Sequence, residues 1–128
     1  MKVWAAVVIF GALGAISRYG ISVWMPQSGS DGWPWATFVI NVLGSLALGI
    51  ILALAARYKL GAVWREGIGT GFLGAFTTFS AYSVETVRLV QAGNASFAVA
   101  YAASSIILGV GAALAGTVAA SGTRSGQG

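Results

Sequence analysis

Long apolar runs separated by short polar segments dominate the chain. Four runs are long enough to cross a membrane as helices, which requires about 20 predominantly apolar residues. They lie at residues 3–24, 35–56, 67–90 and 97–120. The segments between them are rich in Gly, Pro, Asn and charged residues, which is typical of turns. The pattern predicts an all-α integral membrane protein with four transmembrane helices per subunit. These helices form a single domain over residues 1–120, followed by a disordered tail at 121–128.

The third run departs from the composition of a lipid-facing helix. Residues 71–83, with the sequence GFLGAFTTFSAYS, combine glycines, hydroxyl side chains and aromatic rings. Non-helical backbone at membrane depth is tolerated only where it is buried in protein or lines a cavity. Interrupted helices expose carbonyl groups and helix ends, whose partial charges bind ions. We therefore expect the third helix to be broken and to form part of an ion site.

Composition excludes several classes of function. Apolar residues make up 57% of the 128 residues and charged residues 8%, whereas a soluble domain carries about a quarter charged residues. The sequence has no Cys and no His, which removes thiolate chemistry and the commonest zinc ligands. The net charge of +4 is spread along the chain without a basic cluster that resembles a nucleic-acid site. Glu85 has no second buried acid to work with, so we expect no enzyme; its simplest role is a bond with Arg88.

Polar side chains at membrane depth favour an anion as the ligand. Thr37, Asn41 and Ser45 are four residues apart and so share one face of the second helix. An Asn side chain offers two N–H donors. Hydroxyl donors stand in the third and fourth helices, at Thr77, Thr78, Ser80, Ser83, Tyr101, Ser104 and Ser105. A lone buried Asn is commonly a link between helices, but this donor-rich set, with almost no buried carboxylate, suits an anion.

An aromatic stripe accompanies these donors. Phe76, Phe79 and Tyr82 recur every three residues, a spacing that core packing also explains. The edges of aromatic rings carry positive partial charge. A small anion that has lost its water can therefore lie against ring edges as well as against hydrogen-bond donors.

Four short helices leave little material for a pore inside one subunit, so we expect a conduction path to need an oligomer. Small residues in the first and fourth helices allow close backbone approach, either between subunits or within one. They are Gly11, Gly14, Ala15, Gly109, Ala112, Ala113 and Gly116.

These features together resemble the Fluc (CrcB) family of fluoride-specific ion channels. The resemblance is carried by residues 71–86 of the third run, by residues 11–19 of the first and by residues 33–44 at the start of the second. It implies a dual-topology dimer, in which two copies are inserted in opposite orientations and form two antiparallel fluoride pores. It also implies a prokaryotic plasma or inner membrane, passive export of cytoplasmic fluoride and fluoride resistance.

The resemblance further implies roles for individual residues. Backbone carbonyls of Gly74 and Thr77 would hold a structural Na⁺ at the dimer centre, as hard oxygen ligands suited to a small cation. Arg18 would lie near an aqueous vestibule and raise the local anion concentration. The expected residues of the fluoride pore are Asn41, Phe79, Tyr82, Ser80, Ser83, Tyr101, Ser105 and Thr37. The chain differs from the family at three positions. Tyr82 stands where Phe is usual, and Ala81 replaces a common hydroxyl residue. Gly109, one turn after Ser105, leaves fewer polar side chains along the pore side of the fourth helix.

The charges leave two partners open. With four crossings, five basic residues fall on one side, namely Lys2, Arg57, Lys59, Arg65 and Arg124. Arg88 and Arg18 belong to the other side. This bias favours a single orientation, whereas a dual-topology homodimer should be nearly unbiased. The partner is therefore either a second copy of this chain or a homologous paired subunit of an obligate heterodimer.

Two other classes of membrane protein have this size. A small multidrug-resistance-type transporter needs an intramembrane carboxylate in its first helix, but the first run contains Arg18 and no Asp or Glu. A non-conducting membrane subunit would explain the glycines as packing residues. It would not explain Asn41 together with the hydroxyl cluster at residues 77–83.

Overall fold

The computed structural model describes residues 1–25, 29 and 32–122 of the chain. The regular elements of this part are all helices. They are α1 (Val3–Trp24), α2 (Trp35–Tyr58), α3 (Ala62–Glu66), the π-helix η1 (Gly67–Leu73), α4 (Gly74–Phe76), α5 (Phe79–Gln91) and α6 (Ala95–Ser121). Most of the first polar segment and the tail from residue 123 lie outside the described residues, as does Arg124.

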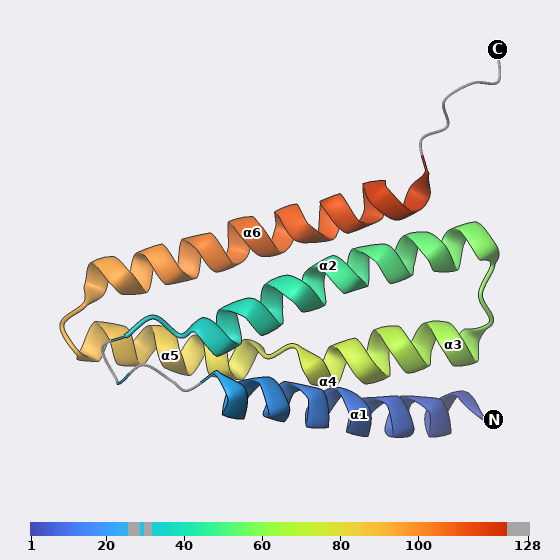
Figure 1. The fold of residues 1–128 in the computed structure, drawn as a ribbon, viewed down its shortest axis with the longest axis horizontal. Helices are drawn as coiled ribbons and strands as arrows, with labels where there is room; N and C mark the ends of the chain where they lie inside the picture. The colour runs from blue at the N-terminus through green and yellow to red at the C-terminus, as the bar shows by residue number, and fades with distance from the viewer. Residues whose placement is uncertain (26–28, 30–31, 123–128) are drawn as a thin grey trace, which may run out of the picture.

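The helices form an elongated bundle with their axes roughly side by side (Figure 1). Helix α6 packs along α2, and α1 packs along η1 and α4, while α5 lies against α6. The N-terminus, the end of α2, the start of α3 and the end of α6 gather at one end of the bundle. The end of α1, the start of α2, the end of α5 and the start of α6 lie at the other.

Glycines set the closest helix contacts within this subunit. A Cβ added at Gly49 would overlap the carbonyl of Ala113 on α6, and one at Gly116 would overlap the carbonyl of Leu46 on α2. On the other side of the bundle, a Cβ at Gly14 would overlap the backbone of Phe72 in η1. The predicted small residues Gly14 and Gly116 therefore serve packing inside the subunit, as does Gly49, which was not predicted, because a larger side chain would hold the backbones apart.

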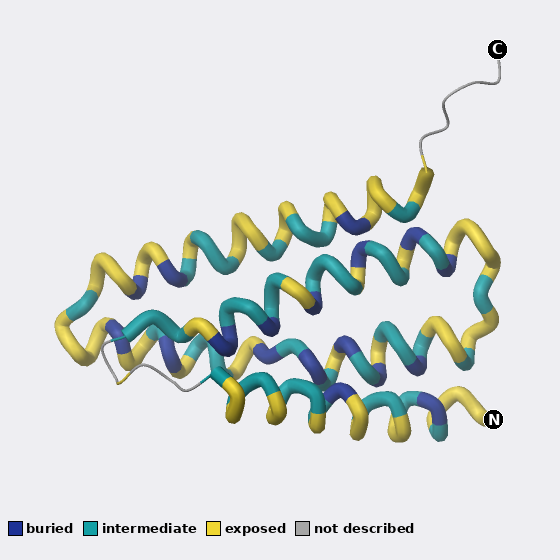
Figure 2. Tube along the Cα trace, viewed as in Figure 1, coloured by how far each residue is buried: buried dark blue, intermediate teal, exposed yellow. Residues whose placement is uncertain are grey.

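The outer faces of the bundle are apolar. Large hydrophobic side chains such as Trp4, Ile16, Trp24, Ile107 and Val118 are more than half exposed, and exposed residues follow α1 and α6 along their length (Figure 2). Helices α1, α2 and α6 are each long and apolar enough to cross a membrane. The chain is thus a multi-pass membrane protein whose exposed apolar surface suits lipid.

The bounds of the three long helices agree closely with the predicted runs. Helix α1 coincides with residues 3–24, α2 continues two residues beyond 56, and α6 extends from 95 to 121, so that Ser121 is helical and not part of a tail. The third predicted run differs in form. It is divided among η1, α4 and α5 and is preceded by α3, and none of these elements has the length of a crossing by itself.

Candidate functional site

The backbone leaves the helical conformation between α4 and α5. Thr77 has φ −76° and ψ 158°, and Thr78 has φ −146° and ψ 117°, so both residues are extended. Thr78 is the N-cap of α5, where its Oγ1 accepts the Ala81 N–H at 3.2 Å. β-Branched Thr suits extended backbone and is a favoured N-cap. The two threonines therefore account locally for the end of one helix and the start of the next.

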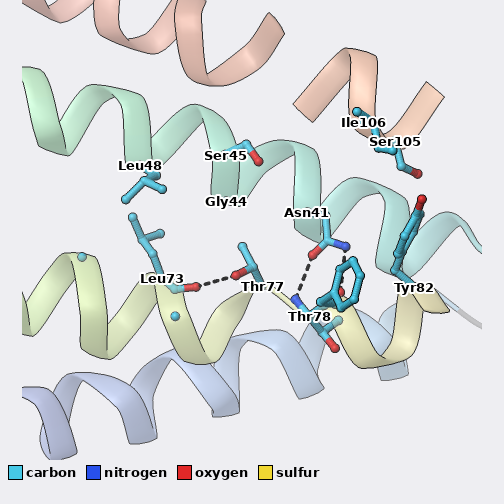
Figure 3. A pocket seen from close by; sticks show the side chains of 13 residues that line it. Asn41, Gly44, Ser45, Leu48, Leu73, Thr77, Thr78, Tyr82, Ser105 and Ile106 are labelled. Atoms are coloured by element: carbon cyan, nitrogen blue, oxygen red, sulfur yellow. Dashed lines mark hydrogen bonds between the residues drawn. The ribbon is translucent and has the colours of Figure 1, made fainter. Parts of the chain in front are cut away.

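Asn41 of α2 pairs with the backbone of this break. Its Nδ2 donates to the Thr78 carbonyl at 2.9 Å, and its Oδ1 accepts the Thr78 N–H at 2.8 Å (Figure 3). One amide side chain thus satisfies both backbone groups of an extended residue that has left the helical hydrogen-bond pattern. Since an Asn side chain has two N–H donors, the second donor of Asn41 has no acceptor among the described residues and can bind a ligand.

The break frees backbone carbonyls, among them those of Gly74 and Thr77. In a continuous helix the Thr78 N–H would bond the Gly74 carbonyl, and the Ala81 N–H would bond the Thr77 carbonyl. The first N–H donates instead to Asn41 Oδ1 and the second to Thr78 Oγ1. The carbonyls of Gly74 and Thr77 are therefore without their helical donors, and such oxygens are hard ligands appropriate for a small cation.

A pocket of about 360 Å³ opens beside the break. Its walls come from α2, η1, α4, the break, α5 and α6, and its polar groups include the side chains of Asn41, Ser45, Tyr82 and Ser105. None of the described residues that line it is charged. The lining residues are Asn41, Gly44, Ser45, Leu48, Gly69, Leu73, Gly74, Thr77, Thr78, Phe79, Tyr82, Ser105 and Ile106. The pocket is thus mainly apolar with a few hydrogen-bonding groups, which is typical of a binding site.

The aromatic residues of the pocket differ in their surroundings. Phe79 is 80% exposed, and its ring lies 5.6 Å from that of Tyr82 at an interplanar angle of 39°. Tyr82 is partly buried, and its hydroxyl donates to the Ala102 carbonyl of α6 at 3.3 Å. The Phe79 ring is therefore free on its outer side, whereas the Tyr82 ring is held between α5 and α6.

Two predicted pore residues lie in a separate buried network. Thr37 Oγ1 donates to Glu85 Oε1 at 2.7 Å, and the Tyr101 hydroxyl donates to Glu85 Oε2 at 2.8 Å. All three residues are buried. The expected bond between Glu85 and Arg88 is not made within the described residues: α5 turns Glu85 inward, where two hydroxyl donors satisfy the carboxylate. Thr37 and Tyr101 do not line the pocket, although each is one helical turn from a residue that does.

The sequence contains a weak signal for this network in the spacing of its polar residues. Each of the three helices carries a pair of polar residues three or four positions apart. The pairs are Tyr82 and Glu85 on α5, Thr37 and Asn41 on α2, and Tyr101 and Ser105 on α6. Residues three or four apart share a helical face. The three polar faces meet in the structure, which explains why Glu85 is paired across helices and not along its own.

The remaining predicted residues lie around the pocket. Ser80 Oγ is 3.2 Å from Thr78 Oγ1, and Ser83 Oγ donates to the Phe79 carbonyl at 2.8 Å; neither residue lines the pocket. Arg18 is on α1, away from the lining residues. The structure thus brings together Asn41, Phe79, Tyr82 and Ser105 with the two carbonyls. It places the other five residues outside the pocket.

Fold and pocket define a small multi-pass membrane protein with a mainly apolar cavity that carries a few hydrogen-bonding groups at a helix break, and sequence comparison places it among known proteins. The sequence profile of the family described as "CrcB-like protein, Camphor Resistance (CrcB)" matches residues 5–117. The chain belongs to this CrcB family, whose named relatives are ion channels and not enzymes.

Several relatives are similar over most of their length. The chain is 41% identical over 117 residues to the fluoride-specific ion channel FluC of Saccharophagus degradans, which covers 90% of this chain and 86% of the relative. It is 45% identical over 103 residues to the fluoride-specific ion channel FluC 2 of Listeria monocytogenes serotype 4b, covering 80% and 78%. The corresponding protein of Acidobacterium capsulatum is 43% identical over 113 residues, covering 88% and 90%.

Proposed function

We propose that this protein is a fluoride-selective channel that lets cytoplasmic fluoride leave the cell passively and so confers fluoride resistance. The observation that carries the proposal is the pocket at the break, where a free amide donor of Asn41, hydroxyl groups and the rings of Phe79 and Tyr82 converge without a charged side chain. Relatives at 41–45% identity are named fluoride-specific ion channels.

The chemistry of the pocket favours a small anion. Fluoride is a strong hydrogen-bond acceptor, and donors are the groups that the pocket supplies. Ring edges add positive partial charge in a mainly apolar setting. Larger halide ions are weaker hydrogen-bond acceptors than fluoride, so the same donors bind them less strongly. No coupling to ATP or protons is needed for a passive path.

The conducting unit is proposed to be a dimer of two subunits in opposite orientations. The segments α3, η1, α4 and α5 act together as the fourth crossing, broken at Thr77 and Thr78. The pocket opens at the surface of the subunit, where Phe79 is 80% exposed. The freed backbone carbonyls and the other hydrogen-bonding groups of this pocket are unfavourable against lipid, so a second subunit is the natural cover. Two inverted subunits then give two antiparallel pores.

A structural Na⁺ is proposed at the centre of this dimer. The Gly74 and Thr77 carbonyls fit the ion, since the N–H groups that would occupy them in a helix donate elsewhere. Together, the two subunits would supply four such oxygens, and backbone carbonyls are hard ligands that bind alkali and alkaline-earth cations.

The predicted residues outside the pocket are proposed to extend the path. Thr37 and Tyr101 are one turn from Asn41 and Ser105, so they continue the polar faces of α2 and α6 beyond the pocket. Ser80 and Ser83 lie next to the two pocket aromatics of α5, and Arg18 attracts anions to a vestibule.

The distribution of basic residues bears on both possible partners. Lys2, Arg57, Lys59 and Arg65 lie at the end of the bundle that contains the N-terminus, and Arg88 lies toward the other end. The basic end favours the cytoplasm, which opposes insertion of the same chain in both orientations. The partner is therefore either a second copy that tolerates this bias or a paired subunit with the opposite bias.

Fluoride efflux from liposomes that contain only this purified protein tests the proposal. We expect rapid fluoride efflux and chloride efflux close to that of empty liposomes. Comparable chloride flux would refute a selective pore. If neither ion moves until a homologous subunit of opposite charge bias is co-reconstituted, the channel is a heterodimer; if fluoride still does not move, the proposed function is wrong.

A further inference from the structure

Glu66 is a partly exposed carboxylate near the start of the broken segment that α3, η1, α4 and α5 form. Thr70 Oγ1 donates to its Oε2 at 2.7 Å, and Arg65 Nε lies 3.1 Å from its Oε1. The bond to Thr70 spans one turn and holds the carboxylate over η1, toward the break. An ionised carboxylate accepts about four hydrogen bonds, so both oxygens of Glu66 have room for another donor.

Arg88, on the far side of the break, has no acidic partner within the described part of the subunit. The residue is exposed on α5, and its side chain makes no hydrogen bond or ion pair with another described residue. Glu85, three residues earlier, is turned inward and bonded to two hydroxyl groups. Arg88 stands in the last turn of α5, where a cation is favourable. Its five guanidinium N–H donors are nevertheless left for a partner outside the subunit.

Glu66 and Arg88 lie equally far along the chain from the break. Thr77 is eleven residues after Glu66 and eleven residues before Arg88. At about 1.5 Å per helical residue, each is roughly 15 Å from the break, which is half of the ~30 Å thickness of the hydrocarbon core. In Figure 1, α3 and α5 lie on opposite sides of α4 and the break. The acid and the cation therefore mark opposite borders of the membrane in one subunit.

Both residues belong to faces that the subunit leaves uncovered. Steps of four residues lead from Glu66 to Thr70 and Gly74, which are both exposed. On α5, Val84 and Arg88 are also four apart and exposed. The helices use their other sides within the subunit, where η1 packs on α1 and α5 packs on α6. The broken segment thus offers a partner an exposed acid on one side of the break and an exposed cation on the other.

We infer that Glu66 of one subunit forms an ion pair with Arg88 of an inverted second copy of this chain, an inference that rests on the proposed antiparallel dimer. Inversion about the break exchanges its two sides, so the α3 end of one copy lies at the membrane level of the α5 end of the other. A twofold axis then makes two identical pairs, since residue i contacts j and j contacts i in such an interface. A parallel dimer would bring each residue to the level of its own copy.

The pair commits the partner to a second copy of this chain. The bias of basic residues opposes insertion of one chain in both orientations, so a homodimer needs contacts that favour the inverted arrangement. Hydrogen bonds between a guanidinium and a carboxylate are charge-assisted and strong. The antiparallel dimer gains two such pairs, whereas a parallel dimer places like charges together, which is unfavourable.

Crosslinking tests the contact directly, because the chain has no Cys of its own. Glu66→Cys and Arg88→Cys are co-expressed with tags of different length, reconstituted in liposomes and treated with a short bismaleimide. A bifunctional reagent is needed because two long side chains keep the Cα atoms of an ion pair farther apart than a disulfide allows. We expect a covalent dimer that carries both tags, and little dimer from either variant alone.

Val99→Cys is the matched control for accessibility. Val99 is 68% exposed near the start of α6, at the same end of the bundle as the end of α5. It is two residues from the buried Tyr101 and so faces away from the core of the bundle. Glu66→Cys should not crosslink to it. Equal crosslinking to Val99→Cys and Arg88→Cys, or crosslinking between two copies of Glu66→Cys, overturns the inference.

An exchange of charges tests whether the contact is an ion pair. Glu66→Arg and Arg88→Glu should each raise the dissociation constant of the purified dimer in detergent about tenfold or more, the lower range for close charge pairs at an interface. The combined variant should recover much of the affinity, because opposite charges face each other again. Lys2→Glu is the control for net charge, since Lys2 precedes α1 and is exposed. If the combined variant dissociates as readily as the single ones, Arg88 serves only the end of α5 or lipid headgroups, and the ion pair is wrong.

The two measurements separate this inference from the proposed function. Crosslinks between Glu66→Cys and Arg88→Cys in a protein that moves no fluoride would refute the channel and leave the pair standing. Fluoride flux from this chain alone, without those crosslinks, would refute the pair and leave the channel standing. Flux that appears only with a homologous paired subunit also refutes the pair, since the pair requires a second copy of this chain.

Discussion

The side chain of Asn41 and the backbone of Thr78 form two reciprocal hydrogen bonds, at 2.9 and 2.8 Å. This pair joins α2 to the point where the chain leaves one helix and enters the next. It holds the break open, because it satisfies the N–H and the carbonyl that a continuous helix would use. The same pair directs the remaining Asn41 N–H and the Gly74 carbonyl toward other partners. The packing of α2 on the break and the proposed ion binding therefore depend on the same contact.

The first prediction concerns Asn41→Asp. An Asp carboxylate still accepts the Thr78 N–H, but its second oxygen faces the Thr78 carbonyl and repels it. It also brings negative charge to the anion path. We expect fluoride efflux to collapse and stability to fall by about 1–3 kcal/mol, the cost of an unsatisfied buried group.

Asn94→Asp provides the matched control for this charge change. Asn94 directly precedes α6 and lies outside the pocket, so the same change there adds the charge away from it. Efflux from liposomes and chemical unfolding in detergent check both variants. Wild-type flux in Asn41→Asp would reduce Asn41 to a structural link between helices.

Much of this arrangement can be predicted from the sequence, but not the pairing of particular side chains. The apolar runs located α1, α2 and α6 within two residues, because length and hydropathy are local properties. The unusual composition of the segment GFLGAFTTFSAYS is also a local property, and this segment contains the two extended threonines, Thr77 and Thr78. The partners of Glu85 were missed, since they depend on how α2, α5 and α6 are rotated against each other. Such rotation is set by packing across the bundle and leaves only the weak signal of polar residues three and four apart.

The second prediction tests the close packing of α2 on α6. Gly49→Ala places a methyl group against the Ala113 carbonyl, which forces the two helices apart. We expect a loss of stability of about 1–3 kcal/mol, as is typical of overpacking. Gly111→Ala is the control, since a Cβ at Gly111 on α6 meets nothing within 4 Å. Thermal unfolding in detergent compares the two, and equal stability would contradict the observed contact.

The third prediction concerns the buried carboxylate of Glu85. Tyr101→Phe removes the donor to Oε2 while it keeps the ring contacts of Tyr101, including that with Trp33 at 5.6 Å. The carboxylate oxygen is then buried without a partner, and we expect a loss of about 1–3 kcal/mol or more. Thr37→Val should act similarly at Oε1.

A triple variant is the control for the stability effect of the whole network. It combines Tyr101→Phe, Thr37→Val and Glu85→Leu. Replacing all partners of a polar group by apolar side chains is often nearly neutral, so the triple variant should recover most of the stability lost in the single variants. A triple variant that unfolds more readily than either single one would mean that the network contributes net stability.

The last prediction turns on Phe79, whose ring is 80% exposed in the subunit. Phe79→Ile keeps the position apolar but removes the ring edge. Because the ring is not buried in the subunit, the change leaves no internal cavity, and we expect little effect on folding. Fluoride efflux should fall about tenfold or more, since roughly 1.4 kcal/mol at a barrier changes a rate tenfold. Phe97→Ile is the control, because Phe97 is a partly exposed ring at the start of α6 that lies outside the pocket. If both variants conduct as the wild type does, the Phe79 ring does not face the ion path, and the anion depends on the hydrogen-bond donors and the Tyr82 ring.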